Sequence, residues 1–174
     1  MIEIRKAGPA DISTIQQLAE TTWWPTYEPI VGADQVRYML NAFYSTEIIG
    51  QQIASGSQTY ILLLDEGVAK GFAAFSPRSE DPDIYKLHKL YCLPAVQGKG
   101  YGRQLVQAVE LAVLEAGKIT LDLNVNRHNN AKSFYEKMGF AVAYREDIEI
   151  GQGYEMNDYV MRKVLNRDSS DQKD

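Results

Sequence analysis

Three glycines at alternating positions, Gly98, Gly100 and Gly102, constrain this chain more than any other feature of its sequence. They separate a β-prone run at residues 84–93 from a segment with helical spacing of apolar residues at 102–116. Glycines at such a turn leave backbone N–H groups uncovered, and the dipole of the following helix favours negative charge at the same place. The order of strand, glycine turn and helix therefore predicts a loop that binds a phosphate or diphosphate.

Two common phosphate-binding loops do not fit this segment. A Walker loop needs Gly-Lys-Ser/Thr, and here Gly100 is followed by Tyr101. A dinucleotide-binding fingerprint needs its third glycine where Arg103 stands. A diphosphate from another cofactor therefore remains, and a tight turn that only allows close helix packing is the alternative interpretation.

Length and composition limit the remaining classes of function. The 174 residues are 45% hydrophobic and 24% charged, which predicts one globular domain over residues 1–165 and a polar, disordered tail at 166–174. A net charge of -5 argues against a nucleic-acid partner. One cysteine and two histidines are too few for a thiolate zinc cage or a histidine-rich metal site, so no structural metal is implied. Short apolar runs and an N-terminus unlike a signal peptide predict a cytoplasmic protein without a membrane partner.

Hydrophobic periodicity predicts alternating strands and helices. Pro25, Pro29 and Gly32 indicate a loop before the second helix. The expected elements, in chain order, are a strand at 2–6, a helix at 11–21, a loop and a helix within 22–43, a short helix at 46–54, a hairpin at 58–64 and 68–77, a strand at 84–93, a helix at 102–116, a strand at 119–125, a helix at 129–138 and an antiparallel pair at 139–150 and 154–165.

The glycine segment resembles that of the GNAT superfamily of acetyl-CoA-dependent N-acetyltransferases. The family signature, Gln/Arg-x-x-Gly-x-Gly/Ala after a strand, is matched by Gln97, Gly100 and Gly102. A second block at residues 129–140 is similar to the family's closing segment. The resemblance implies the GNAT fold, an α/β (α+β) architecture with a mixed, mostly antiparallel central sheet flanked by helices. It also implies acetyl-CoA, and hence coenzyme A, as the cofactor.

The same resemblance implies which residues contact the cofactor. The backbone of the strand ending at residues 90–94 pairs with the pantetheine arm, and the glycine loop holds the diphosphate. An asparagine of the second block also contacts the cofactor, and both Asn129 and Asn130 are candidates. The implied cofactor-binding residues are Tyr91, Cys92, Leu93, Gln97, Gly98, Lys99, Gly100, Tyr101, Gly102, Arg103, Asn129 and Asn130.

Two residues are candidates for the chemistry of acetyl transfer. Direct attack by a neutral amine requires a route for a proton and an acid for the departing thiolate. The resemblance implies Tyr135 as the general acid, with core packing as the alternative. His88 stands near the family's glutamate and is a candidate base, with a structural role as the alternative. A Cys92–His88 nucleophile pair is excluded, because four strand residues separate them by about 13 Å.

Acidic and aromatic residues are candidates for binding the amine acceptor. Aromatic rings pack alkyl chains and carboxylates pair with cations, although core packing is the alternative for the aromatics. The proposed acceptor-binding residues are Trp23, Tyr27, Glu28 and Glu155, and Trp24 and Asp158 are further candidates.

The acceptor itself is only partly constrained by the sequence. Residues 22–53 resemble a polyamine-acetylating branch of the superfamily, which places spermidine-like amines first among small-molecule acceptors. A peptide or protein N-terminal acetyltransferase and a non-catalytic acyl-CoA sensor are the alternatives. Members of the family often dimerise, so a homodimer is left open.

Overall fold

The computed structural model describes residues 1–93 and 99–166. They form two compact units that each draw on two separate stretches of the chain. The first consists of Met1–Ser76 and Lys89–Ala108, and the second of Pro77–His88 and the described residues from Val109 onward. Both the cofactor strand and the helix after the glycine loop contribute residues to both units.

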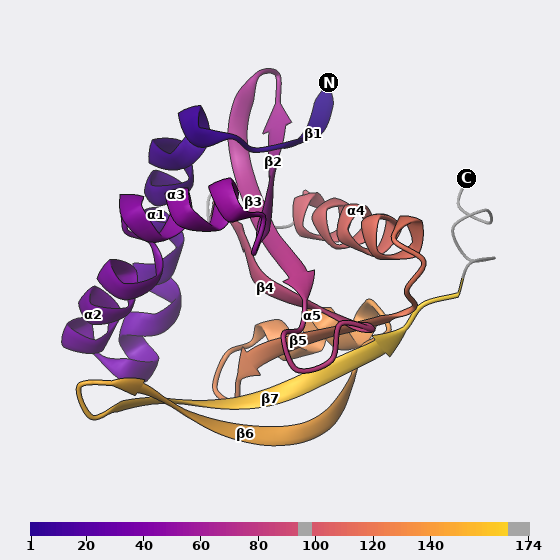
Figure 1. Cartoon of the computed structure of the whole chain (residues 1–174). Helices are drawn as coiled ribbons and strands as arrows, with labels where there is room; N and C mark the ends of the chain where they lie inside the picture. Colours follow the sequence, from indigo (N-terminus) through magenta and orange to yellow (C-terminus); the bar gives the residue numbers. More distant parts are fainter. Residues whose placement is uncertain (94–98, 167–174) are drawn as a thin grey trace. The chain divides into compact units, whose positions relative to one another are not determined.

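The first unit contains three strands and three helices that precede the cofactor strand (Figure 1). Its core is formed by side chains that are almost fully buried, among them Ile15, Val36, Ile49 and Phe72. The helices contact one another, and the three strands pair antiparallel. The elements are β1 (Ile2–Lys6), the 3₁₀ helix η1 (Pro9–Asp11), α1 (Ile12–Val31), α2 (Ala33–Phe43), α3 (Thr46–Ser55), β2 (Thr59–Asp65) and β3 (Val68–Pro77).

Helix α1 is longer than the sequence predicts. The expected loop after Thr21 was wrong, because the helix continues through Pro25 and Pro29 to Val31. Proline removes one helical hydrogen bond, but burial of Trp23 and Tyr27, at 4% and 6% exposure, stabilises this stretch from outside the helix. Tertiary packing therefore outweighs the local propensity here.

The turn between β2 and β3 confirms the predicted hairpin. Glu66 and Gly67 both have positive φ, at 51° and 78°, as a tight two-residue hairpin turn requires. Only glycine adopts such angles without cost, so Glu66 is held there by the pairing of the two strands.

The second unit is built on the remaining strands, with β6 (Ala141–Gly151) and β7 (Tyr154–Val164) as a long antiparallel ribbon (Figure 1). Strand β4 (Ile84–Cys92) pairs parallel to β5 (Thr120–Asn126) through residues 84–87. Strand β5 also pairs antiparallel to β7. The two helices after the cofactor strand are α4 (Tyr101–Glu115) and α5 (Ala131–Lys137).

Strand β5 has two faces of opposite character. Leu121, Leu123 and Val125 are at most 4% exposed and form its apolar face. Alternate residues of a strand point to opposite sides, so Asp122 and Asn124 lie on the other face. The apolar face belongs to the core, and the side chains of the polar face form hydrogen bonds with side chains of other elements.

Hydrogen bonding orders the seven strands as β1-β2-β3-β4-β5-β7-β6. Of the pairs described above, β4 with β5 is parallel and the others are antiparallel. The protein is therefore a mixed α/β protein with a mostly antiparallel sheet and flanking helices, as the sequence predicted.

Candidate active site

The glycine loop leads directly into helix α4. Gln97 and Gly98 lie outside the described residues. Gly100 has φ of +80°, and its carbonyl accepts a hydrogen bond from the Gln104 amide at 3.1 Å, so it starts the helix. No acidic residue occupies the first turn of α4, which contains Gly102 and the exposed Arg103. This helix end therefore has the backbone conformation and electrostatics that suit a phosphate group.

The side chain of Tyr101 is used inside the protein. It is 5% exposed, and its hydroxyl donates a hydrogen bond to the carboxylate of Asp65, which raises the pKa of the phenol. The hydroxyl thus attaches the first turn of α4 to the end of β2. The predicted contact of Tyr101 with the cofactor then concerns its backbone, and it stays a prediction.

The end of the cofactor strand lies very close to β3. A Cβ atom at Gly71 would be 2.9 Å from the carbonyl oxygen of Tyr91 and 2.9 Å from the sulfur of Cys92. The Leu93 amide also donates to the carbonyl of Lys70 at 2.9 Å. Glycine at position 71 therefore permits the close approach that fixes the backbone of residues 91–93, where the cofactor contacts are predicted.

Cys92 is a thiol with little nucleophilic character. Burial raises its pKa to about 11, and the thiolate is the reactive form of cysteine. The electrostatics thus agree with the geometric argument against a cysteine nucleophile.

Two predicted acceptor-binding aromatics belong to a buried ring cluster. The rings of Trp23 and Tyr27 are 4.4 Å apart, and the Tyr27 hydroxyl lies 3.2 Å from that of Tyr91. This arrangement favours the packing role for Trp23 and Tyr27. In contrast, Glu28 and Glu155 are exposed. Acceptor binding by these four residues stays a prediction.

Lys89 is a buried cation that the sequence did not single out. Its side chain is 9% exposed, and Nζ lies 4.9 Å and 4.8 Å from the ring centroids of Tyr44 and Tyr60. Nζ donates to the Tyr60 hydroxyl, which in turn donates to Oε1 of Gln52 at 2.6 Å. Burial lowers the pKa of this ammonium to about 7. A titratable group therefore lies in the strand that carries His88 and Tyr91.

This shift predicts a pH-dependent stability. The unfolded lysine keeps its proton up to about pH 10.4, whereas the folded one releases it near pH 7, so stability rises with pH above 7. The slope is at most about 1.4 kcal/mol per pH unit. We expect Lys89→Met to remove this slope, measured by urea unfolding between about pH 7 and about pH 8.5. Both proteins keep Cys92, so the titration of its thiol cancels from the comparison. Parallel curves for the two proteins would contradict the assignment.

The second sequence block forms a turn and the short helix α5. The Asn129 side chain accepts from the Ala131 amide at 2.9 Å, whereas Asn130 is exposed. Tyr135 is 8% exposed, and its ring lies 5.2 Å from that of Phe134 and 5.9 Å from that of Phe140. The rings fix the orientation of the tyrosine. The cofactor contact of either asparagine and the catalytic role of Tyr135 stay predictions.

A buried carboxylate on β5 joins two arginines. Asp122 is fully buried and accepts hydrogen bonds from Arg78 at 2.9 Å and 3.0 Å and from Arg162 at 2.7 Å and 2.9 Å. Burial acts to raise the pKa of Asp122, but the hydrogen bonds from Arg162 and Arg78 outweigh it, so the pKa is lowered. The alternation of residues 121–126 signals this polar face in the sequence, although it does not identify the arginines.

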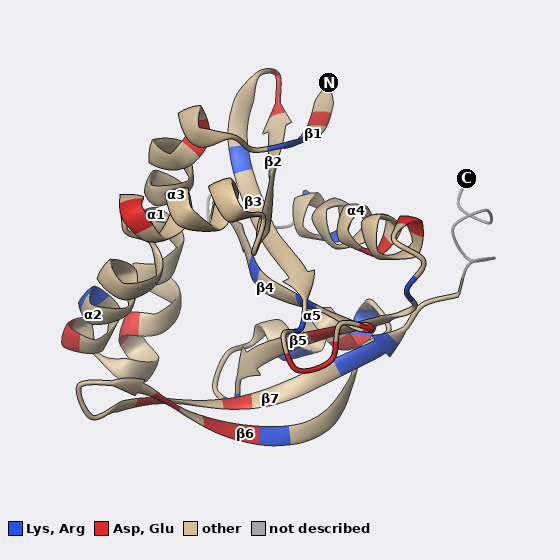
Figure 2. Cartoon of the chain, viewed as in Figure 1, with Lys and Arg blue, Asp and Glu red and all other residues tan. Residues whose placement is uncertain are grey.

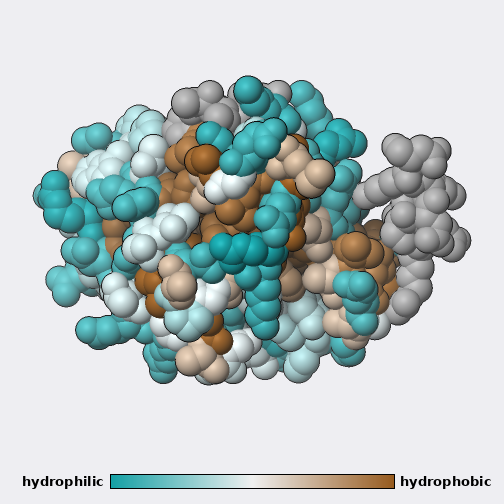
Figure 3. Space-filling view, turned by 90° about the horizontal axis from the view of Figure 1, so that it is seen from above, coloured by the Kyte–Doolittle hydropathy of each residue, from teal (hydrophilic) through white to brown (hydrophobic). Residues whose placement is uncertain are grey.

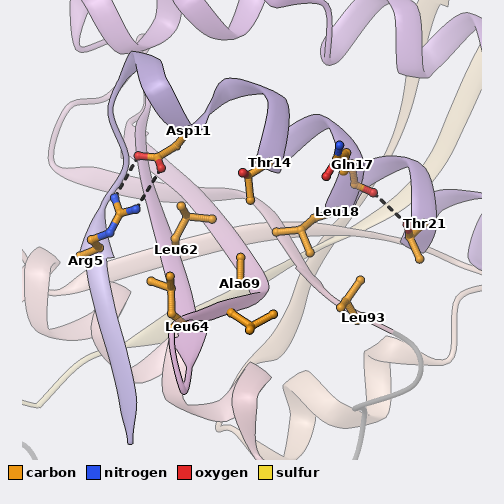
Figure 4. Close-up of a pocket in the computed structure, with 12 residues that line it drawn as sticks. Arg5, Asp11, Thr14, Gln17, Leu18, Thr21, Leu62, Leu64, Ala69 and Leu93 are labelled. Carbon is orange, nitrogen blue, oxygen red and sulfur yellow. Dashed lines mark hydrogen bonds and ion pairs between the residues drawn. The ribbon is translucent and has the colours of Figure 1, made fainter.

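A pocket of about 490 Å³ lies between α1 and the β2–β3 hairpin. Figure 4 shows the ion pair of Arg5 and Asp11 at one end and leucine side chains along its floor. Hydrophobic residues, drawn in brown, are exposed on the face of the molecule that Figure 3 shows. Of the predicted cofactor-binding residues that the structure describes, only Leu93 lines the pocket. Its lining residues are Arg5, Asp11, Thr14, Gln17, Leu18, Thr21, Leu62, Leu64, Gly67, Val68, Ala69 and Leu93.

Within residues 1–93 and 99–166, no three histidine, cysteine or acidic side chains come together as metal ligands. Helices in the described parts of the chain are too short or too polar to cross a bilayer.

The comparisons with known proteins identify the family. Residues 28–163 match the model of the acetyltransferase (GNAT) domain. The chain therefore belongs to the GNAT acetyltransferase family and is an acetyl-CoA-dependent N-acetyltransferase.

Two relatives extend over most of the chain. An uncharacterized N-acetyltransferase of Mycobacterium bovis is 27% identical over 156 residues, which cover 89% of this chain and 98% of that protein. A spermidine N(1)-acetyltransferase of Thermoplasma acidophilum is 29% identical over 143 residues, which cover 81% of this chain and 89% of that protein.

A solved structure shares the fold. The PaiA N-acetyltransferase of Thermoplasma acidophilum, in complex with coenzyme A, has a TM-score of 0.81 and 25% identity. The alignment covers 95% of this chain and 99% of that one. The helix end at Gly100 and the close-packed strand end at residues 91–93 fit a diphosphate and a backbone-paired arm, so these residues of the present chain are suited to hold the cofactor.

Proposed function

We propose that this enzyme transfers the acetyl group of acetyl-CoA to a primary amine of a small molecule, with a polyamine as the first candidate. The glycine turn that starts α4, with Gly100 at φ +80° and no acid in the first helical turn, carries the proposal for the cofactor. The relative in Thermoplasma acidophilum, a spermidine N(1)-acetyltransferase, supports the acceptor class.

In the proposed reaction, the neutral nitrogen of the acceptor forms a bond to the acetyl carbonyl carbon while the carbon–sulfur bond breaks. Acetyl-CoA supplies the acetyl group as a thioester. Tyr135 donates its phenolic proton to the departing sulfur, and His88 takes the proton that the attacking nitrogen releases, either directly or through water. Tyr135 then regains a proton from solvent and His88 releases one to solvent, so both groups return to their starting states. The acetyl group passes directly from sulfur to nitrogen, so no covalent intermediate with the enzyme is required.

The proposal is tested by following thiol release from acetyl-CoA with polyamines, amino acids, aminoglycosides, short peptides and a no-acceptor control. We expect turnover with spermidine or a simple diamine, well above the control. Turnover with peptides alone would identify an N-terminal acetyltransferase. Binding of acetyl-CoA without turnover on any acceptor would instead favour a sensor.

A further inference from the structure

A polar cluster connects the last three strands of the second unit. The Asn124 side-chain amide donates to Glu146 at 3.0 Å and to Asp158 at 3.1 Å. Glu146 lies directly opposite Asp158 in the β6–β7 ladder, so their side chains share one face. Figure 2 shows acidic segments side by side on β6 and β7. The side-chain amide of one asparagine therefore donates hydrogen bonds to two carboxylates.

Two oxygens of this cluster accept no hydrogen bond from any residue that the structure describes. Asp158 is 5% exposed, and its Oδ1 is buried without a donor, as is Oδ1 of Asn124. A buried acceptor without a donor costs about 1–3 kcal/mol, and more when it is charged. Two buried oxygens of the cluster, one of them on the Asp158 carboxylate, can therefore still accept hydrogen bonds. A cationic donor would suit them best.

Within residues 1–93 and 99–166, the cationic side chains do not form an ion pair with the Asp158 carboxylate. Arg127 pairs with Asp147, and no lysine or arginine of the described residues forms an ion pair with Asp158 or Glu146. Burial is the main cause that raises the pKa of Asp158, and the charge of Glu146 adds to it. Lys86 and Arg127 act in the opposite direction at longer range. A cation bound from outside the protein would offset both the cost of burying the Asp158 carboxylate and its repulsion by Glu146.

An apolar pair lies beside the carboxylates on the same face. Ile148 and Met156 are opposite each other, two residues along their strands from Glu146 and Asp158. Side chains two apart in a strand point the same way. A cation carried on a methylene chain would thus find carboxylates for its charge and apolar side chains for its chain.

The cluster is also attached to the block that carries Tyr135. Asp158 is paired with Asn126, whose carbonyl accepts from the Asn129 amide at 2.9 Å. The Arg127 amide donates to the carbonyl of Asn157 at 3.0 Å. The strand end that holds Asp158 therefore also fixes the turn into α5.

We propose that Asp158, Glu146 and Asn124 bind the protonated, non-reacting amino group of a diamine or polyamine acceptor. This inference rests on the proposed function and specifies its substrate class. The reacting nitrogen must be neutral to attack, so the bound ammonium is a second amino group of the same molecule. Its three N–H groups match oxygens of Asp158, Asn124 and Glu146. The site selects diamines over monoamines.

The test measures binding of 1,4-diaminobutane and butylamine by calorimetry, with and without saturating coenzyme A. In Asp158→Asn we expect the dissociation constant for the diamine to rise about 10- to 100-fold, as for a lost charge-assisted hydrogen bond. We expect butylamine binding to change less than about 2-fold. Glu149→Gln removes one negative charge from the opposite face of β6 and is the matched control.

The outcomes separate this inference from the proposed function. If Asp158→Asn and Glu149→Gln weaken diamine binding equally, or the wild type binds no diamine, the site is refuted. If the wild type acetylates amines while Asp158→Asn keeps the wild-type affinity, the site fails and the function stands. If Asp158 is needed for diamine binding but no amine is acetylated, the function fails and the site stands. Glu146→Gln, on the less buried carboxylate, repeats the test if Asp158→Asn does not fold.

Discussion

Replacing Asp122 with asparagine is expected to lower the free energy of unfolding by about 3 kcal/mol. The fully buried carboxylate holds Arg78, which is itself only 11% exposed and has Glu80, at 4.0 Å, as a second and more distant ionic partner. Arg162 is 37% exposed, so it can regain water and reduce the loss. The estimate therefore lies at the low end of the range for breaking a buried ion pair. Chemical denaturation at neutral pH measures the change.

Asp83→Asn is the control for this prediction. Asp83 pairs with Lys118 at 2.6 Å but is 79% exposed, and surface pairs contribute little. The lowered pKa of Asp122 adds a pH signature, because its contribution is lost as pH falls through the folded pKa. Wild type and Asp122→Asn should therefore begin to converge in stability below about pH 4 and become equal only below the folded pKa of Asp122. Equal effects of both substitutions at neutral pH would show that the buried network contributes little.

Replacing Tyr135 with phenylalanine is expected to lower kcat about 100-fold with little change in acetyl-CoA affinity. Only the hydroxyl is removed, so the ring contacts with Phe134 and Phe140 remain. The loss then reports proton donation to the departing thiolate. Steady-state kinetics with the best acceptor, together with direct titration of acetyl-CoA, separate the two quantities.

Tyr144→Phe provides the matched control, because this tyrosine is 45% exposed on β6 and removal of its hydroxyl leaves the same ring. We expect its kcat to stay within about 2-fold of wild type. If Tyr135→Phe also keeps its kcat, the proton donor is another group. If the wild type shows no turnover and Tyr135→Phe binds acetyl-CoA equally well, a sensor is the better description.

Local patterns predicted most of the elements. The hairpin around residues 65–67 and the helix after Gly100 follow from turn chemistry and periodicity, and both were found. The continuation of α1 through Pro25 and Pro29 was missed, because it depends on burial of Trp23 and Tyr27 against residues distant in the chain. Local propensity cannot register such contacts.

The site was predictable to a smaller extent. The glycine loop is a local motif, and its helix start at Gly100 could be read directly. Lys89 was missed because a lysine in a strand is normally exposed, and only long-range packing against Tyr44 and Tyr60 reveals its burial. The acidic cluster joins three strands, so its geometry depends on register, although Asp158 was already a candidate from its charge.

The two-faced pattern of β5 has a consequence for how the enzyme diversifies. A shift of one residue would move Leu121 and Leu123 to the polar face and would take the buried Asp122 away from its two arginine partners, so only one alignment of the strand is tolerated. Within that alignment, a change at Asn124 leaves the apolar side untouched. Substitutions on the polar face of β5 can therefore accumulate one residue at a time while the chain keeps the same hydrophobic core.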